Sequence, residues 1–474
     1  MRTSLTPGRR RPSPRRLWLL SLCAVALAIT GTTVALQSAS AKPPPRWGHR
    51  PITQPVATPS VTAEPSATEP SATEPSETEP AATSTSDAPD ATDACGRKAS
   101  ASAQAKVTDV KLPSQVKGYG REGDTEVLPL AIASAPNGKS WLAWVAASGD
   151  KVYLGQLGCD DELVGEPTVF EGIDLQDVSA DADGGVLLIT KKGECGTGPL
   201  CGGTSSPCNT MHMIRFDTSG QQVWDRQVTN LDGSRKGYSD GARFVWWYQH
   251  HGRLAYDGEN YAAYFGTAIT VKNGNCVDIH QGDRMQVVDS QGALVKNQGF
   301  EVGCSHAWTS RILHDPQKQD WVMNCATDNQ CRIAQPNPYR TVAASKCDGT
   351  LFGGDLVAAK NGYWSAWSQG NAVKLSRFTT GAAEATVDPG VATQHPHLVK
   401  YGADRMLISW GSGAQTKAKV LDRGTGATIG SELSIPATDH DFLAVKEYPD
   451  GSVAFPAPGT DSSSVKIARV LPMS

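Results

Sequence analysis

The repeat unit of this chain is clearest in residues 177–191, DVSADADGGVLLITK, and residues 213–224, MIRFDTSGQQVW. A short apolar strand, an Asp/Gly turn and a second apolar strand are followed by a later strand with its own turn. Short runs that alternate apolar and polar residues between Gly, Asn and Asp turns are typical of antiparallel sheets. The stretch therefore predicts one small antiparallel β-sheet.

The same unit recurs along residues 105–472. Alignment on the first turn gives seven starting strands, at residues 130–133, 178–180, 254–256, 312–314, 356–358, 398–400 and 442–444. Second strands rich in Trp, Tyr or Leu follow, for example at residues 141–144, 261–265, 321–323, 363–367, 407–410 and 453–455. Such repeats resemble the blades of a β-propeller, whose neighbouring sheets bury each other's faces around a channel. We predict an all-β, seven-bladed β-propeller, with an open pair of sandwiches as the competing architecture.

The phrase Asp217-x-x-Gly220-x-x-x-Trp224 resembles the blades of quinone-enzyme and kelch-type propellers. This resemblance is at the level of the fold, and it implies no cofactor and no specific family. Residues 106–110 read as one more strand ahead of the first repeat. We expect this strand to pair with the last blade and cover its edge, which closes the ring.

The first 41 residues have the layout of an export segment. An apolar run from residue 17 to 36 follows a basic stretch and precedes Ala39-Ser40-Ala41, where a signal peptidase would cut. The basic stretch contains Arg9, Arg10, Arg11, Arg15 and Arg16. Residues 1–41 are thus predicted to be a signal peptide, or a signal anchor if uncleaved, because the run is long enough to span a bilayer. An extracellular, periplasmic or cell-surface location follows.

Residues 42–94 are rich in Thr, Pro and Glu and almost free of aromatic and branched apolar residues, with Glu-Pro-Ser-Ala-Thr recurring from Glu64 to Pro80. A segment of this composition cannot bury enough apolar surface to offset the entropy of ordering it. We predict a disordered stalk over residues 42–94 and a propeller domain over residues 95–474.

Ten cysteines lie beyond the export segment, at Cys95, Cys159, Cys195, Cys201, Cys208, Cys276, Cys304, Cys325, Cys331 and Cys347. An even count in an exported chain indicates a disulfide set, whose pairing the sequence leaves open. The Cys-x-x-Cys pairs that are common in zinc sites do not occur.

The formal net charge is −4, and cleavage after residue 41 removes six arginines and no acidic residue. An acidic chain without a basic patch is a poor candidate for binding nucleic acid. We expect no nucleic-acid partner, a membrane contact only through an uncleaved N-terminal segment, and a monomer.

Charged residues gather at the starts of the innermost strands. The column before the starting strands contains Pro129, Asp177, Arg253, Arg311, Asp355, His397 and Asp441. Residues two positions earlier share a face with this column, because side chains alternate along a strand. These earlier positions include His251, His395 and Asp439, and His440 is adjacent. The alignment therefore predicts a polar ring at the channel mouth.

Three interpretations of this ring stay open. In the first, Asp and Arg neutralise each other across the channel, because an unpaired buried charge is costly. In the second, the ring binds a glycan or a small polar ligand through arginine forks, carboxylates and an aromatic face. The residues of that second site would be Asp177, Arg253, Arg311, Asp355, His251 and Trp308.

In the third interpretation, nitrogen and oxygen donors from adjacent blades bind a divalent cation. The donors would be His395, His397, Asp439, His440 and Asp441. A lyase or hydrolase could then use His251 or His397 as a general base. The leading hypothesis is a secreted or surface-tethered propeller that binds a carbohydrate or other polar ligand. The alternatives are a metal-assisted lyase or hydrolase of acidic polysaccharide and a protein-interaction scaffold.

Overall fold

The computed structural model describes residues 95–122, 125–127, 129–193, 209–229, 243–245, 252–273, 275–296, 298–301, 304, 309–327, 330–336, 338–438 and 443–474. All of them belong to one compact unit, Thr85–Ser474. The predicted signal segment and stalk lie outside the described residues. Among the residues described, no helix has the length and apolar character needed to cross a membrane.

Seven antiparallel sheets follow one another along the chain, and each is one blade. Blade 1 contains β4 (Leu130–Ser134), β5 (Ser140–Val145), β6 (Lys151–Leu157) and β7 (Leu163–Glu171). Blade 2 contains β8 (Asp174–Asp181), β9 (Gly184–Lys191), β10 (Thr210–Asp217) and β11 (Gln222–Gln227). Blade 3 contains β12 (Arg243–Phe244), β13 (Arg253–Tyr256), β14 (Tyr261–Asn273), β15 (Cys276–Val288) and β16 (Phe300–Glu301).

The next three blades have four strands each. Blade 4 contains β17 (Ser310–Asp315), β18 (Asp320–Ala326), β19 (Arg332–Pro336) and β20 (Tyr339–Ala344). Blade 5 contains β21 (Leu351–Ala358), β22 (Tyr363–Gln369), β23 (Ala372–Phe378) and β24 (Ala385–Val387). Blade 6 contains β25 (His397–Tyr401), β26 (Arg405–Ser412), β27 (Gln415–Asp422) and β28 (Thr428–Ile435).

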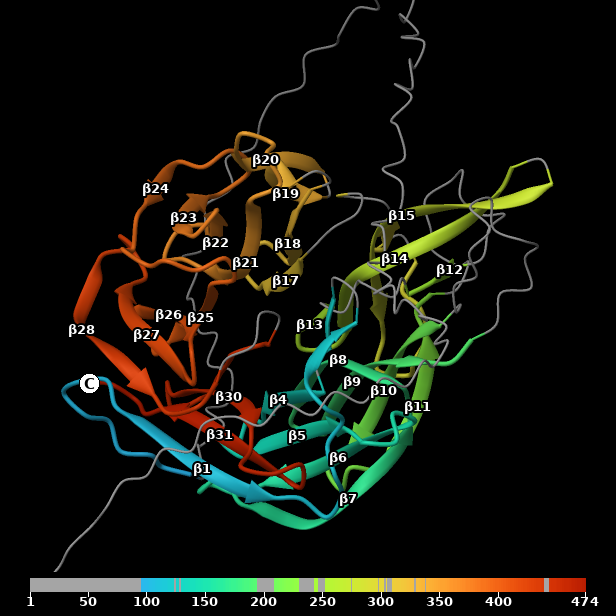
Figure 1. Cartoon of the computed structure of the whole chain (residues 1–474), viewed down its shortest axis with the longest axis horizontal. Coiled ribbons are helices and arrows are strands. Elements are labelled where there is room, and N and C mark those ends of the chain that lie inside the picture. Colours follow the sequence, from blue (N-terminus) through green and yellow to red (C-terminus); the bar gives the residue numbers. More distant parts are fainter. Residues whose placement is uncertain are drawn as a thin grey trace, which may run out of the picture. The chain divides into compact units, whose positions relative to one another are not determined.

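Blade 7 is built from both ends of the domain. It contains β29 (Lys446–Glu447), β30 (Val453–Pro458), β31 (Ser464–Val470) and, at its outer edge, β1 (Ala105–Lys111). β1 pairs with β31 along its whole length, from Ala105 opposite Val470 to Lys111 opposite Ser464. Figure 1 shows β1 beside β31. The predicted closure by an N-terminal strand is therefore confirmed. A separate two-stranded hairpin, β2 (Gly120–Glu122) and β3 (Thr125–Val127), lies between β1 and blade 1 in sequence.

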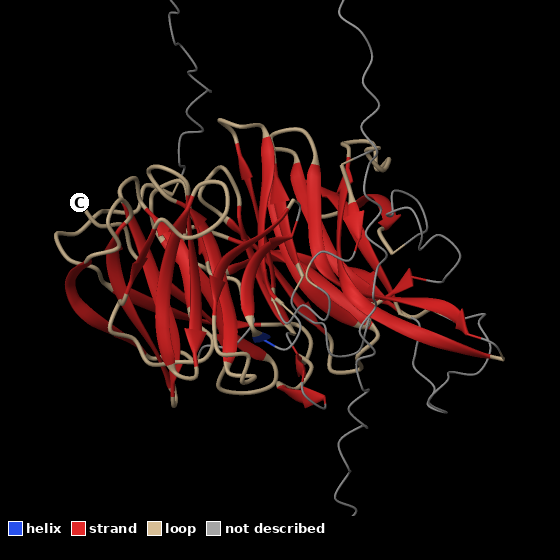
Figure 2. Cartoon of the chain, turned by 90° about the horizontal axis from the view of Figure 1, so that it is seen from above, coloured by secondary structure: helices blue, strands red, loops and turns tan. Residues whose placement is uncertain are grey.

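The blades form a closed ring, and the core is distributed between them. Each of seven hydrophobic clusters joins two neighbouring blades, and one of them joins blade 7 to blade 1. The innermost strands contact each other in the order β4, β8, β13, β17, β21, β25 and β29, and β29 contacts β4. Figure 2 shows the strands standing between two faces where turns gather. The prediction of an all-β, seven-bladed propeller is confirmed.

The inner strand of blade 7 differs from the sequence alignment. The alignment places it at residues 442–444, whereas β29 begins at Lys446, which pairs with Ala454. A tight turn, in which the Tyr448 amide donates to the Ser452 carbonyl, fixes this register. Leu443 and Val445 are buried between blades 6 and 7 without being part of a strand. Apolar spacing alone therefore placed this strand too early.

Three disulfides are described: Cys95–Cys159, Cys304–Cys325 and Cys331–Cys347. Cys276 is also disulfide-bonded. The predicted use of cysteines in disulfides is confirmed for these residues, and Cys195, Cys201 and Cys208 lie outside the described part of the chain. Disulfides are compatible with an extracellular location.

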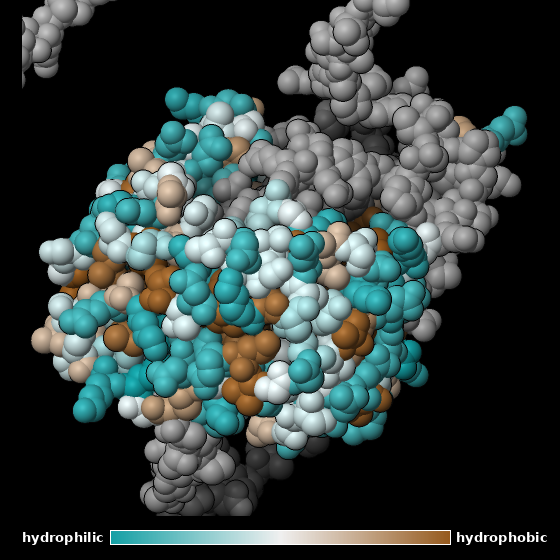
Figure 3. All heavy atoms as spheres, turned by 60° about the horizontal axis from the view of Figure 1, so that its bottom comes forward, coloured by the Kyte–Doolittle hydropathy of each residue, from teal (hydrophilic) through white to brown (hydrophobic). Residues whose placement is uncertain are grey.

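The surface of Figure 3 is mixed in polarity. Hydrophobic residues form separate patches among hydrophilic ones on this face. Large exposed hydrophobic side chains in the described part are Val164, Val169, Val223 and Tyr339, and they lie on the outer strands of blades 1, 2 and 4. Scattered single residues of this kind are ordinary on a soluble surface. These residues therefore do not mark a binding surface, and the central channel is the better candidate for a functional site.

Candidate functional site in the central channel

A β-bulge in the inner strand of blade 2 directs two polar side chains toward blade 3. Leu175 pairs with Ile189 and Asp177 with Leu188, so Gln176 is the extra residue. Bulges of this kind re-aim side chains. The amide of Gly252 donates to Gln176 Oε1 at 2.8 Å, and the amide of Leu254 donates to Asp177 Oδ2 at 2.9 Å. Blade 2 thus holds Gly252, directly before the inner strand β13, and Leu254 within that strand.

Blade 5 repeats this arrangement. Its inner strand changes register between Gly353 and Leu356, and the amide of Leu398 in blade 6 donates to Asp355 Oδ2 at 3.1 Å. The two glycines before Asp355 permit a close approach of three blades. A Cβ on Gly353 would lie 2.2 Å from Thr309 Oγ1, and one on Gly354 would lie 2.4 Å from the Pro396 carbonyl oxygen. A side chain at Gly354 would therefore force backbone to shift, and one at Gly353 would displace the Thr309 hydroxyl.

Asp355 joins blades 4, 5 and 6 through its two oxygens. Arg311 Nε donates to Oδ1, and His397 Nδ1 lies 3.3 Å from Oδ2. The guanidinium of Arg311 also donates to the Ser310 carbonyl, and that of Arg253 donates to the Gly252 carbonyl. We call Asp177, Arg253, Arg311, Asp355 and His397 the channel belt. Their relative exposures range from 0% to 8%.

The charges of the channel belt act on each other. Burial alone would raise the pKa of the Asp355 carboxyl, but Arg311, His397 and Arg253 outweigh it and hold this pKa well below its ordinary value. Burial and the nearby Arg311 guanidinium lower the pKa of Arg253 to about 10. Both groups are therefore charged at neutral pH.

Lys446 reaches the channel belt from blade 7, past the inner strand of blade 1. Its Nζ atom lies 2.7 Å from Asp177 Oδ1, although Lys446 belongs to blade 7 and Asp177 to blade 2. Asp177 is fully buried, and the Lys446 side chain is 20% exposed. The lysine therefore contacts the channel belt at one side and lines a solvent-accessible space at the other.

That space is a cavity of about 760 Å³ at the ends of the inner strands. We call it the channel cavity. It is lined by residues 133–136, 178–180, 400–403, 446–451 and 472–473, from blades 1, 2, 6 and 7 and the C-terminal segment. Lys400 Nζ lies 3.5 Å from Glu447 Oε2, and these two partly exposed side chains also line the cavity. The lining combines such charged groups with alanine, proline and methionine side chains.

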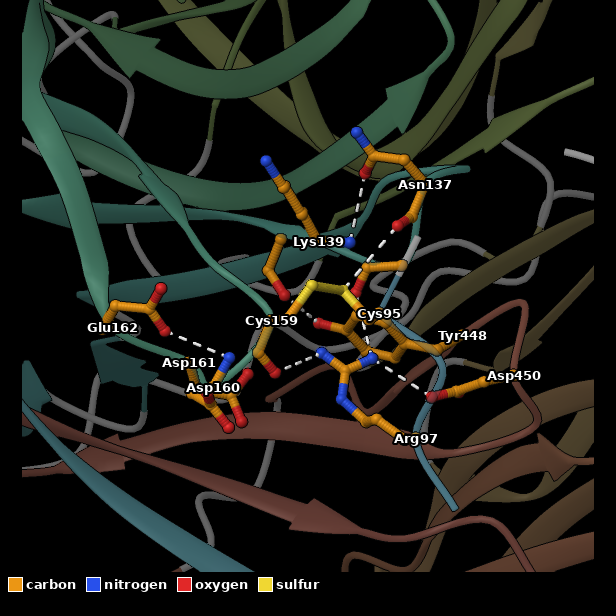
Figure 4. The surroundings of a disulfide bond; sticks show 12 residues. Cys95, Arg97, Asn137, Lys139, Cys159, Asp160, Asp161, Glu162, Tyr448 and Asp450 are labelled. Carbon is orange, nitrogen blue, oxygen red and sulfur yellow. Dashed lines mark hydrogen bonds and ion pairs between the residues drawn. A yellow bond between two sulfur atoms is a disulfide. The ribbon is translucent and has the colours of Figure 1, made fainter. Parts of the chain in front are cut away.

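The segment before β1 fastens one wall of the channel cavity (Figure 4). Cys95 is disulfide-bonded to Cys159 in blade 1. Arg97 donates to the carbonyls of Gly138 and Cys159 in blade 1 and to Asp450 Oδ2 in blade 7. Asp450 belongs to the cavity lining. The N-terminal segment therefore joins the turns of two blades beside the cavity.

The structure brings five of the predicted site residues into the channel belt, where Asp and Arg pair between blades. His395 instead packs edge-on against Phe352, with ring centroids 4.9 Å apart. His251, Trp308, Asp439, His440 and Asp441 lie outside the described residues. Whether the belt binds a ligand stays a prediction.

Among the described residues, one cluster has the donor types of a metal site: Asp283, Cys304 and Cys325. The two sulfurs are bonded to each other. Asp283 accepts hydrogen bonds from the Cys304 amide and from the Tyr264 hydroxyl. Since a disulfide offers no thiolate and the carboxylate already has partners, these residues do not fit a cation.

Sequence reasoning missed Lys446 and the channel cavity. Lys446 was overlooked because the alignment placed the inner strand of blade 7 too early. The turns that line the cavity carry ordinary Gly, Pro and Asp signals, which do not distinguish a cavity wall from any other turn. Placing the start of the last inner strand at residue 446 would have put Lys446 in the column of polar residues at the channel.

No family model and no curated protein matches the chain. It is similar to the solved Dos1 propeller, at 9% identity over 77% of this chain and 84% of that one, with a TM-score of 0.41. It is also similar to the WD40 domain of Toxoplasma gondii coronin, at 9% identity over 78% and 87% of the two chains, with a TM-score of 0.42. The PQQ-bound aldose sugar dehydrogenase of Streptomyces coelicolor gives 13% identity over 68% and 99%, with a TM-score of 0.36. These scores are low, so the fold assignment rests on the strand topology.

Proposed function

We propose that the protein is a secreted or surface-tethered binding propeller that holds a carbohydrate or another polar ligand in the channel cavity. The cavity itself carries the proposal: its volume of about 760 Å³ falls in the range of roughly 300–1,000 Å³ that is common for small-molecule sites. Its lining supplies apolar side chains and a few converging polar groups, which is the usual composition of such sites.

Export and tethering are supported by the sequence of residues 1–94 and by the disulfides. The metal-assisted lyase or hydrolase and the protein-interaction scaffold stay predictions from sequence, because no contact among the described residues favours either. A divalent cation has no fitting set of ligands in that part of the chain.

The test is binding of the purified protein to a glycan array, repeated with a variant that blocks the mouth of the cavity. Ala403→Trp places a large ring at an exposed lining residue. The matched control is Ala382→Trp, at an exposed residue of a blade 5 turn away from the cavity. We expect Ala403→Trp to abolish binding and Ala382→Trp to retain it. Equal binding by both variants, or no glycan bound by the protein, would refute the proposal.

A further inference from the structure

The charges around the channel cavity are paired one to one. Lys446 pairs with Asp177, Lys400 with Glu447, and Arg97 with Asp450. Within the described part of the chain, these six side chains form no other ion pair. The cavity therefore presents balanced charge to a ligand.

Lys446 has hydrogen-bonding capacity left over. An ammonium group carries three N–H donors. Asp177 Oδ1 is the one partner of Lys446 among the described residues, and it takes one donor. The Lys446 side chain is 20% exposed and lines the cavity. Two donors are thus available to an oxygen atom inside the cavity.

From these observations we infer that the ligand is an uncharged, hydroxyl-rich molecule, a neutral saccharide, and that Lys446 anchors it by donating to its hydroxyl oxygens. This inference rests on the proposed function. An anionic ligand would lose its hydration and would meet no unpaired lysine in the lining, because Asp177 already neutralises Lys446 and Glu447 neutralises Lys400. A hydroxyl group needs no such compensation.

The rest of the lining suits a sugar ring. Ser134 and Ser179 are partly exposed and line the cavity, and a hydroxyl both donates and accepts hydrogen bonds. Pro136, Pro449 and Met473 offer apolar surface for the C–H faces of a ring. The arginines of the channel belt, which would suit an acidic sugar, do not belong to this lining. The lining therefore favours neutral over acidic saccharides.

The test compares neutral with uronate- or sulfate-bearing oligosaccharides on a glycan array, followed by calorimetric titration of the best neutral binder. We expect neutral glycans to be retained, with a Kd that changes less than about twofold between low and high salt, because no net charge is neutralised on binding. Lys446→Met should weaken this Kd at least about tenfold, equivalent to about 1.4 kcal/mol.

Two further variants separate anchoring from folding. Ser179→Ala keeps the Lys446–Asp177 pair and should weaken binding severalfold without lowering the unfolding temperature. Lys419→Met is the matched control, because Lys419 contacts carbonyls of residues 389 and 390 away from the cavity. Retention of acidic glycans only, with a strong salt dependence, would refute the inference and leave the proposed function standing. No glycan retained at all would refute both.

Discussion

The junction between blades 7 and 1 and the channel belt both bury an arginine–aspartate pair, but they use it differently. At the junction, Arg469 donates through Nε and Nη2 to the two oxygens of Asp161, at 3.0 and 2.5 Å. Its Nη1 donates to Ser452 Oγ, and its guanidinium lies 4.0 Å from the centre of the Tyr448 ring. Every nitrogen of this guanidinium has a partner, and both charged side chains are 1% exposed.

In the channel belt the carboxylate is the shared group. Asp355 accepts from Arg311 and from the Leu398 amide and also lies beside His397. Three blades therefore depend on one carboxylate, whereas the junction pair serves two blades only. The comparison indicates that the Arg469–Asp161 pair joins blades 7 and 1 in one fixed arrangement. In the channel belt, the charge of Asp355 is instead shared among several partners.

The largest expected effect is at the junction. Arg469→Met should lower the free energy of unfolding by about 3–5 kcal/mol, because it leaves Asp161 buried and unpaired. Arg311→Met should cost less, because Asp355 keeps the Leu398 amide, His397 and the field of Arg253. Urea unfolding of both variants measures the difference.

A double variant sharpens this result. Arg469→Met combined with Asp161→Asn should recover much of the loss, because no buried charge is then left alone. Asparagine suits this position, since residue 161 has a positive φ of 66°. The distinction between the two regions would be contradicted if Arg469→Met were as stable as Arg311→Met or more stable.

The disulfides give the next effect. Replacing Cys95 and Cys159 with serine should destabilise the domain by about 4 kcal/mol, because the bond closes a 64-residue loop that would otherwise be free in the unfolded chain. Replacing Cys331 and Cys347 opens a 16-residue loop and should cost about 3 kcal/mol. Hydrogen exchange should also show lost protection at the Gly451 amide in the first variant only, because that disulfide fastens the wall of the cavity. Equal loss of protection in both variants would argue against the fastening role.

A smaller effect tests the close approach at the belt. Gly354→Ala should lower stability by about 1–3 kcal/mol, because its Cβ would meet the Pro396 carbonyl oxygen. Gly118→Ala is the control, since no atom lies within 4 Å of a Cβ built there. Thermal unfolding of the two variants is sufficient to compare them. If the two alanines are equally tolerated, blades 5 and 6 do not need this contact.

The smallest effect depends on pH. Because its folded pKa lies below the unfolded value of about 3.9, Asp355 stabilises the fold above that pH, and this contribution is lost as the pH falls through the folded pKa. The difference in the free energy of unfolding between the unmodified protein and Asp355→Asn should therefore become smaller below about pH 4. Urea unfolding at neutral and acidic pH measures this difference. A difference that stays constant would show that the Asp355 charge does not stabilise the belt.

The repeat pattern predicted much of the fold because each blade repeats one local rule of strand, turn and strand. It also brought Asp177, Arg311 and Asp355 together, because aligned inner strands converge on one channel. The bulges at Gln176 and after Gly353 could not be predicted in this way. They depend on contacts with the next blade, which no spacing within a single repeat records.

The pairing between blades 7 and 2 could not be predicted from the sequence either. Lys446 meets Asp177, 269 positions earlier in the chain, only because the ring closes. Disulfide pairing likewise depends on the three-dimensional approach of turns, as the bond from Cys95 to Cys159 illustrates. The local sequence pattern therefore predicted the blades, whereas the cavity forms only when the ring closes.

Binding in the channel cavity is tested best by a crystal structure of the protein with the glycan that binds most tightly on the array. We predict the sugar in the channel cavity, with a hydroxyl oxygen within hydrogen-bonding distance of Lys446 Nζ and the Lys446–Asp177 pair intact. A sugar bound on the outer strands or at the opposite mouth of the channel would contradict this prediction.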